Sequence, residues 1–356
     1  MNNKKILIIN NGLAGGGIER ASVSMANYFV TLGYEINVVA VYKSEHFFTL
    51  DPRISFTEPT FSRETTNRNL YVLKMMAFVR KTVKEIRPYV ILAFGEWTNS
   101  FVVMAISGLQ IPCFLSDRMS PSLHLTPIHR YLKKIYYKKA KGIIAQTNYA
   151  KDVIKYRTGA KNIKVISNPV NCIERVDCVQ KNRIVTVGRL SVEKGHRYLI
   201  EAFARVKDKT WELSIVGDGK ERETLELLAT NLGITDRVIF HGHQKDFSLQ
   251  LSEAQIFVLP SLKEGFPNAL IEAMSVPLAC ISSNCVAGPS DIIEDGVNGL
   301  LVETGNVDAL ADALNRLIEN PDLRDNIAGE AYKIRETLAF DKIANKYLEF
   351  ILEQNN

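Results

Sequence analysis

Short apolar runs alternate with longer stretches whose apolar residues recur at helical spacing. In the first half of the chain the short runs read as buried strands and the longer stretches as helices. The expected strands are 5–10, 36–41, 89–94, 112–115, 142–145 and 163–166, and the expected helices lie near 18–32, 68–86, 98–108, 125–140 and 148–157. Alternation of this length is typical of a parallel, doubly wound α/β sheet with helices on both faces.

The same alternation restarts after an aperiodic stretch. Its expected strands are 183–188, 212–216, 238–240, 256–260, 278–281 and 300–302, and the tail from 307 reads as helices. The length of 356 residues also favours two domains. We therefore predict two Rossmann-like domains facing across a cleft. The expected division is an N-terminal acceptor-side domain at 1–170, a linker at 171–182, a nucleotide-sugar domain at 183–335, and a C-terminal helix at 336–356 that packs back on the body.

The segment Glu264–Glu272 combines an anion site with two carboxylates. It follows an apolar strand and opens a helix, so its turn presents backbone amides at a helix N-terminus, where anions are favoured. Glu264 and Glu272 are suited to accept hydrogen bonds from hydroxyl groups. This layout fits a ligand with a sugar, a phosphate and a second sugar, as in a nucleotide sugar. The spacing alone also fits a plain turn followed by a solvated helix.

Two other strand ends carry candidate ligand groups. Gly16 and Gly17 lie in a glycine loop after the first strand, and glycines allow backbone amides to approach a ligand closely. The loop does not meet the dinucleotide fingerprint and no acidic residue ends the second strand, which disfavours a nicotinamide cofactor. Arg189 and Lys194 follow the strand at 183–188 and are suited to clamp a diphosphate, or are ordinary surface cations.

Composition excludes several classes of protein. The chain is 46% hydrophobic and 23% charged, as soluble globular proteins are. No apolar run approaches the ~18–20 residues that span a bilayer, and the run at 6–9 is too short for a signal-peptide core. The five cysteines form no C-x-x-C pair, so we expect reduced thiols and no zinc site. These features predict a cytoplasmic protein.

The charge is divided unevenly along the chain. Residues 1–170 hold 24 Lys/Arg and 10 Asp/Glu, whereas residues 171–356 hold 20 and 29. Such a split indicates that the first half meets something anionic. Within it, 128–141 interleaves six Lys/Arg with three tyrosines, which fits a helix on an anionic membrane surface or a solvated helix face. Nucleic acid is not expected as a partner, because no nucleic-acid module surrounds this segment.

Taken in order, the motifs of the second half resemble a known family. These are Gly188-Arg189 with Lys194-Gly195, Val216-Gly-Asp-Gly219, Glu264 with Glu272, and Gly296-Val-Asn-Gly299 before 300–302. With this order and spacing the chain resembles the family 4 glycosyltransferases, retaining enzymes of the GT-B architecture. In the first half the resemblance rests on the loop 15–20 and the turn 168–170.

The resemblance implies roles for individual residues. Arg189 and Lys194 would bind the donor diphosphate and stabilise the departing nucleotide, Glu264 would contact sugar hydroxyls, and Glu272 would accept from the ribose; Glu264, Arg189 and Lys194 are the expected catalytic residues. Further donor contacts are expected from Gly188, Gly217, Asp218, Gly242, His243, Gln244, Gly265, Phe266, Pro267, Asn268, Ala269, Gly16, Gly17 and Asn168. Candidate sugar or acceptor contacts are Asp117, Arg118, Glu96 and Arg20.

The function implied is a retaining glycosyltransferase that needs no cofactor. The chain has no Asp-x-Asp, so no metal is expected. The expected partners are a nucleotide sugar and a polyprenyl-diphosphate-linked saccharide at the inner face of the plasma membrane. UDP is the expected nucleotide, and GDP-mannose is left open. Such enzymes build surface polysaccharide, as in capsule and lipopolysaccharide biosynthesis. The alternatives are a GT-B epimerase or phosphorylase, and a non-catalytic sugar-nucleotide-binding scaffold.

Overall fold

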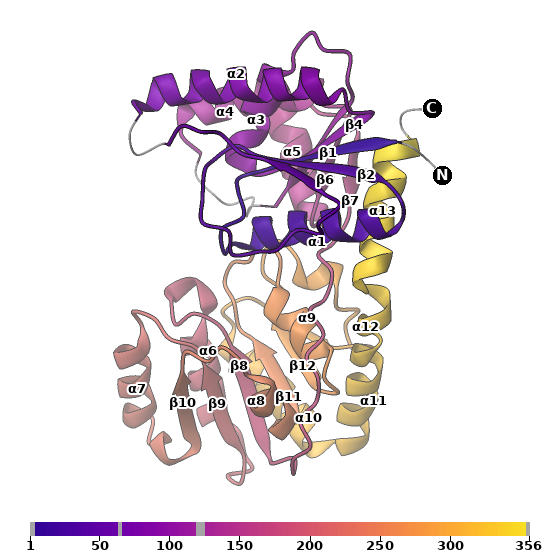
Figure 1. Cartoon of the computed structure of the whole chain (residues 1–356). Helices are drawn as coiled ribbons and strands as arrows, with labels where there is room; N and C mark the ends of the chain where they lie inside the picture. The colour runs from indigo at the N-terminus through magenta and orange to yellow at the C-terminus, as the bar shows by residue number, and fades with distance from the viewer. Residues whose placement is uncertain (1–3, 63–65, 119–124, 354–356) are drawn as a thin grey trace. The chain divides into compact units, whose positions relative to one another are not determined.

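The chain folds into two compact units. The computed structural model describes residues 4–62, 66–118 and 125–353 (Figure 1). Unit 1 contains the residues up to Ser167 and those from Asp341 onward, and unit 2 contains Asn168–Phe340. Within the described residues, no helix is both long enough and apolar enough to cross a membrane.

Unit 1 is built on a parallel sheet with the strand order β3-β2-β1-β4-β5-β6-β7. The strands are β1 (Lys5–Asn10), β2 (Glu35–Ala40), β3 (Ser55–Thr57), β4 (Val90–Phe94), β5 (Cys113–Asp117), β6 (Gly142–Ala145) and β7 (Ile163–Val165). Ile8 pairs with Val38 on one side and with Leu92 on the other. The sequence prediction lacked β3, because three residues at a sheet edge are too few to show an alternating pattern.

Helices cover both faces of this sheet. They are α1 (Gly17–Thr31), α2 (Arg68–Ile86), α3 (Glu96–Ala105), α4 (Pro127–Tyr136), which continues into the short turn η1 (Tyr137–Lys139), and α5 (Asn148–Thr158). Leu7 and Ile9 belong to the core beneath α2, α3 and α5. The strands are buried on both faces, which is why their sequences are continuous apolar runs.

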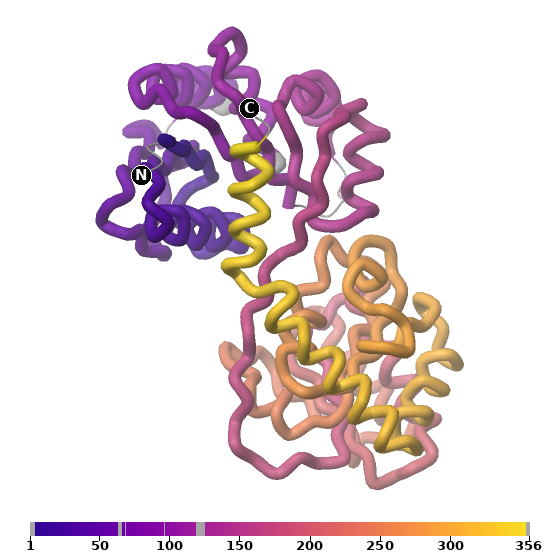
Figure 2. Tube along the Cα trace, turned by 90° about the vertical axis from the view of Figure 1, so that its right-hand side faces the viewer, coloured from indigo at the N-terminus to yellow at the C-terminus, as the bar shows by residue number. Residues whose placement is uncertain are grey.

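The C-terminal helix α13 (Phe340–Glu353) returns to unit 1, as Figure 2 shows in yellow. Tyr347 stacks on Phe94 with ring centroids 6.2 Å apart, and Phe350 meets Phe114 edge-on at 5.2 Å. A side chain at Gly142 would lie 2.7 Å from the Phe350 ring, so glycine permits this close approach. The apolar face of α13 is therefore a part of the core of unit 1.

Unit 2 has a second parallel sheet, with the order β10-β9-β8-β11-β12-β13. The strands are β8 (Arg183–Val187), β9 (Glu212–Val216), β10 (Val238–Gly242), β11 (Ile256–Leu259), β12 (Ala279–Ser283) and β13 (Leu300–Val302). The helices are α6 (His196–Ala204), α7 (Arg222–Asn231), α8 (Ser248–Glu253), α9 (Asn268–Met274), α10 (Val307–Glu319), α11 (Pro321–Tyr332) and α12 (Ile334–Thr337), with short turns η2 (Val192–Lys194), η3 (Thr235–Arg237) and η4 (Pro289–Asp291). The predicted class, two parallel α/β sheets, is confirmed.

The stretch 171–182, expected as a linker, lies along unit 2. The amides of Ile173, Val176 and Lys181 donate to Ser275 Oγ, Ser252 Oγ and the Glu253 carbonyl at 2.8, 2.9 and 2.8 Å. The segment lacks periodicity because helix ends, rather than a regular ladder, satisfy these backbone groups.

Each sheet has one point at which the strand order reverses. In unit 1 the chain runs outward from β1 through β2 to β3 and then resumes at β4 on the other side of β1. In unit 2 the same reversal separates β8 from β11. Loops that leave adjacent strands in opposite directions open a crevice at the carboxyl edge, where ligands of such sheets bind. The two reversals are therefore where candidate site residues should gather.

Candidate functional site

An ion pair joins the two sides of the reversal in unit 2. Lys194 ends the turn η2 after β8, and Glu264 lies in the loop after β11. Lys194 Nζ donates to Glu264 Oε1 at 2.6 Å, and Ser261 Oγ donates to the same oxygen at 2.7 Å. Glu264 is 8% exposed, and the Lys194 side chain is 29% exposed. The sequence assigned these two residues to different parts of the donor and did not predict their pairing.

Glycines let the loops of this edge touch through their backbones. Gly195 has φ +65°, and a side chain there would lie 2.1 Å from the Pro260 carbonyl oxygen. Gly217 has φ +142°, and a side chain there would lie 1.9 Å from the Gly188 carbonyl oxygen. Positive φ and contact with backbone both exclude other residues at these positions. The glycines thus bring the loops after β8, β9 and β11 together.

The loops after β8, β9 and β10 place further predicted residues along one edge. The Gly217 amide donates to the Gly242 carbonyl at 2.9 Å, which joins the ends of β9 and β10. Arg189 is exposed and has no ion-pair partner among the described residues. Asp218 Oδ1 accepts from the Gly219 amide at 2.7 Å.

The end of β10 continues into Gly242, His243 and Gln244, which the sequence predicted as donor contacts. His243 is exposed. Gln244 Nε2 donates to the His241 carbonyl at 2.9 Å, which holds its side chain back on the strand end. His241 itself contacts Ser214 Oγ at 2.6 Å.

The loop from Glu264 to α9 is braced from two directions. A side chain at Gly288, where φ is +123°, would lie 2.5 Å from Pro267 Cδ. Asn168 Nδ2 donates to Asn268 Oδ1 at 3.1 Å, so the predicted residue Asn168 lies at the start of α9. Phe266 is buried, whereas Gly265 and Ala269 are half-buried. The backbone amides of this turn, which the sequence predicted as an anion site, are therefore held in a fixed loop.

Glu272 has a partner that the sequence did not reveal. Asn171 Nδ2 donates to Glu272 Oε1 at 3.1 Å. Asn171 belongs to the aperiodic stretch and has no motif around it. Only the course of that stretch along unit 2 brings the two residues together.

Two buried side chains near the ion pair stay neutral. Burial, together with the Glu264 carboxylate, raises the pKa of the Cys285 thiol to about 11. Burial, together with the Lys194 charge, lowers the pKa of His196 to about 4. Within the described residues neither ring nitrogen of His196 has a hydrogen-bond partner. Arg189, Lys194 and Glu264 therefore hold the charge here.

In unit 1 the strand-order reversal also gathers predicted residues. Gly16 caps α1, Gly17 is its first residue, and Arg20 is exposed in its first turns. This loop meets the end of β4, where Thr98 Oγ1 donates to Asn11 Oδ1 at 3.2 Å. Glu96 begins α3 beside this contact, and its side chain lies outside the described part of the structure.

Asp117 and Arg118, at the end of β5, are both held by other side chains. Asp117 Oδ2 accepts from Lys133 Nζ at 2.8 Å, and both side chains are buried. Arg118 Nη1 donates to the Tyr347 hydroxyl at 3.3 Å. Their role as sugar or acceptor contacts stays a prediction.

Lys133 corrects one expectation about the basic segment 128–141. The side chain was expected on a face that meets a membrane, yet it is 9% exposed and lies over the Tyr137 ring at 4.8 Å. A buried lysine needs a partner, and Asp117 provides one. The outward basic face of the segment is therefore formed without Lys133.

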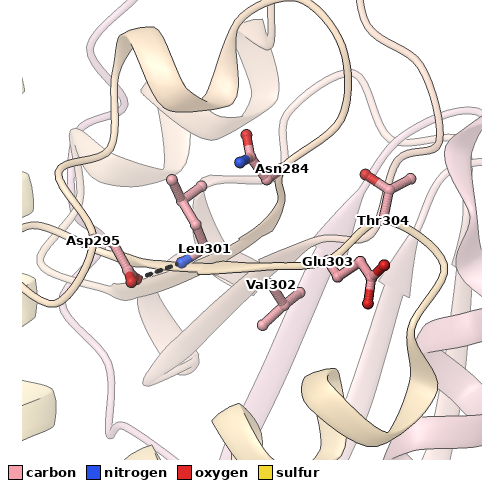
Figure 3. A pocket seen from close by; sticks show the side chains of 6 residues that line it. All are labelled: Asn284, Asp295, Leu301, Val302, Glu303 and Thr304. Carbon is pink, nitrogen blue, oxygen red and sulfur yellow. Dashed lines mark hydrogen bonds between the residues drawn. The ribbon is translucent and has the colours of Figure 1, made fainter.

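A hollow at the ends of β12 and β13 lies apart from the predicted residues. It has a volume of about 650 Å³ and is lined by Asn284, Asp295, Leu301, Val302, Glu303 and Thr304. Figure 3 shows the Asp295 carboxylate turned to the backbone, where it accepts from the Leu301 amide at 2.8 Å. In the described part of the chain no three His, Cys, Asp or Glu side chains are grouped so as to hold a metal ion.

The fold and this edge define a two-unit α/β enzyme of the GT-B type, and comparison with known families places it further. Residues 178–334 match the model described as Glycosyl transferases group 1, and residues 15–174 match Glycosyltransferase Family 4. The chain belongs to this glycosyltransferase family, as its motifs predicted, and it is a glycosyltransferase.

Two named relatives are bacterial glycosyltransferases. A lipopolysaccharide 1,6-galactosyltransferase of Escherichia coli is 32% identical over 67% of this chain and 68% of its own. A protein of Campylobacter jejuni is 26% identical over 99% of both chains and is named GalNAc-alpha-(1->4)-GalNAc-alpha-(1->3)-diNAcBac-PP-undecaprenol alpha-1,4-N-acetyl-D-galactosaminyltransferase. The crystal structure of Anabaena Alr3699/HepE in complex with UDP has the same fold, with a TM-score of 0.80 and 21% identity over 97% of this chain and 98% of that one.

The buried His196 predicts a pH dependence of stability. Its folded pKa of about 4 lies below the ordinary value of 6.5, so acid favours the unfolded state, which binds the proton more readily. Between pH 7.5 and pH 5 this group should remove about 2 kcal/mol from the free energy of unfolding of unit 2. Urea unfolding followed by Trp211 fluorescence, in a Trp97→Phe background, measures it.

The matched variants are His196→Phe, which should lack this part of the slope, and His243→Gln, which changes an exposed histidine and should keep it. An unaltered slope in His196→Phe would show that another group causes the acid sensitivity.

Proposed function

We propose that the protein transfers a hexose or N-acetylhexosamine, with retention at the anomeric carbon, from a UDP-sugar to a polyprenyl-diphosphate-linked saccharide. The observation that carries this proposal is the meeting of Lys194 and Glu264 at the strand-order reversal of unit 2. A cation for phosphate and a carboxylate for hydroxyls, at the edge where such sheets bind ligands, match the two parts of a nucleotide sugar.

The comparisons support the choice of donor and acceptor classes. The Anabaena structure contains UDP, and the Campylobacter relative is named for a GalNAc-containing glycan on PP-undecaprenol. Both matches run over nearly the whole chain. Together they favour a uridine nucleotide and a lipid-linked acceptor over GDP-mannose and a soluble one.

The chemistry is the exchange of one bond at the anomeric carbon. The glycosyl–phosphate C–O bond breaks, the acceptor oxygen forms a new bond on the same face, and a phosphate oxygen of the leaving group receives the acceptor proton. Negative charge grows on the diphosphate, so Arg189, Lys194 and loop amides that are already in place would stabilise the transition state. We propose that these groups take the role of a metal ion.

A panel of nucleotide sugars tests the proposal. Each donor is incubated with the protein, with and without a polyprenyl-diphosphate-linked saccharide, and nucleotide release is measured. We expect release from a UDP-sugar that depends on the acceptor. Release without transfer to any acceptor, or only from a GDP-sugar, would contradict the proposed reaction.

The two carboxylates should fail in different ways. Glu272→Gln should raise the KM for the donor about tenfold with little change in kcat, because a ribose contact acts on binding. Glu264→Gln should lower kcat about tenfold to a hundredfold, because the charge beside Lys194 and the reacting sugar is lost. Steady-state kinetics with Glu319→Gln as an exposed control separates them. Identical defects would mean that the two ends of the donor are misassigned.

We also propose that the outward basic face of 128–141 meets anionic lipid. Lys134, Lys138 and Lys139 are exposed, and each basic residue at such a surface contributes about 1 kcal/mol. Sedimentation with vesicles containing phosphatidylglycerol should show salt-sensitive binding that falls about a hundredfold when all three become Gln. Lys133 is left unchanged, because its removal would strand the buried Asp117.

A control with the same change of charge places three Gln substitutions at exposed lysines of unit 2, Lys207, Lys245 and Lys333. Equal loss of vesicle binding in both variants would contradict a role for this particular segment.

A further inference from the structure

Unit 1 contains a pocket between α4 and α5 that the candidate site does not use. Its volume is about 470 Å³, within the range of small-ligand sites. It is lined by Leu125, Arg130, Tyr131, Lys133, Lys134, Arg157 and Thr158. None of these is among the residues predicted to contact the donor or the sugar.

The charged side chains that line the pocket are all positive among the described residues. In the part of the chain that the structure describes, the lining contains four cationic side chains and no carboxylate. Lys133 is balanced by Asp117 behind it, whereas Arg130, Lys134 and Arg157 have no ion pair with any described residue. Three like charges around one hollow repel each other, so an anion bound there would remove an unfavourable interaction. Arginine forks and a lysine ammonium match phosphate oxygens.

The buried pair fixes the helix that carries most of these cations. Lys133 Nζ lies 2.8 Å from Asp117 Oδ2 at the end of β5, and it also lies over the Tyr137 ring. This contact ties the middle of α4 to the sheet. Arg130 and Lys134, placed before and after Lys133, are therefore presented to the pocket by a helix that is anchored by a buried ion pair.

Apolar side chains stand beside the cations. Ile128 is 58% exposed and Tyr131 is 62% exposed, and they lie three positions apart, so they share one face of α4. Tyr131 also lines the pocket. Exposed apolar groups next to a cationic hollow are suited to a ligand that carries its phosphate on a hydrocarbon chain.

We propose that the pocket between α4 and α5 binds the diphosphate group of an isoprenyl lipid, through Arg130, Lys134 and Arg157. In naming the lipid, this inference rests on the proposed acceptor. An isoprenyl diphosphate and free pyrophosphate both present a diphosphate anion, so free pyrophosphate is the alternative ligand. The residues of this pocket belong to unit 1, whereas the candidate diphosphate contacts Arg189 and Lys194 belong to unit 2.

Calorimetric titration of the full-length chain tests the pocket. The probes are farnesyl diphosphate and inorganic pyrophosphate. Every protein carries Arg189→Ala with the paired changes Lys194→Met and Glu264→Gln, so that the candidate donor site does not contribute and no unpaired carboxylate stays buried. Arg130→Gln with Arg157→Gln should weaken farnesyl diphosphate binding about tenfold to a hundredfold, the effect of losing charged hydrogen bonds. Lys151→Gln with Lys155→Gln, the same charge change on α5 outside the lining, should leave binding near that of the parent.

The outcomes separate the sources and the two proposals. Tighter binding of farnesyl diphosphate than of pyrophosphate supports the lipid, and equal binding of both supports the anion site but rejects the lipid as its source. Undiminished binding in the pocket variant, or the same loss in the control, overturns the site. Sugar transfer by the unsubstituted protein is assayed separately, so a failed pocket with intact transfer leaves the proposed function standing. If the pocket variant loses binding but the unsubstituted protein transfers no sugar, the pocket is supported and the proposed function is contradicted.

Discussion

The ion pair between Lys194 and Glu264 is the contact on which the candidate site of unit 2 depends. It closes the gap between loops that leave β8 and β11 in opposite directions, and Ser261 bonds to the same carboxylate oxygen. A carboxylate that is 8% exposed must be paired, because an isolated charge loses its hydration on burial. Gly195 sets the distance, since any side chain there would meet the Pro260 carbonyl.

Two titratable side chains beside this ion pair are kept neutral by burial. Cys285 and His196 lie close by, but burial keeps the thiol protonated and the imidazole unprotonated near neutral pH. Arg189 is left exposed at the same edge. Near neutral pH the charge at this edge is therefore carried by Arg189 and by the Lys194–Glu264 pair, and not by the thiol or the imidazole. Unit 1 repeats the principle with Asp117 and Lys133, a buried pair that anchors α4.

Much of the fold follows from the sequence, because strands buried on both faces must be continuous apolar runs. The strands β1, β6, β9 and β13 have the predicted bounds. The prediction failed where that signal is absent. β3 is three residues at an edge, and β5 extends through the polar Ser116 and Asp117, whose burial depends on partners from α4 and α13.

The sequence by itself determined the two parallel sheets, the order of the loops at their carboxyl ends, and the motifs that mark the glycosyltransferase family. Only the tertiary structure decided which side chains meet. Lys194 and Glu264 are 70 residues apart, and Asn171 and Glu272 are 101 apart. Likewise, Lys133 looks like any other lysine of a basic helix until Asp117 is seen behind it. The reason is physical: an apolar pattern records burial along one element, whereas a pairing depends on which loops and helices the strand order brings together.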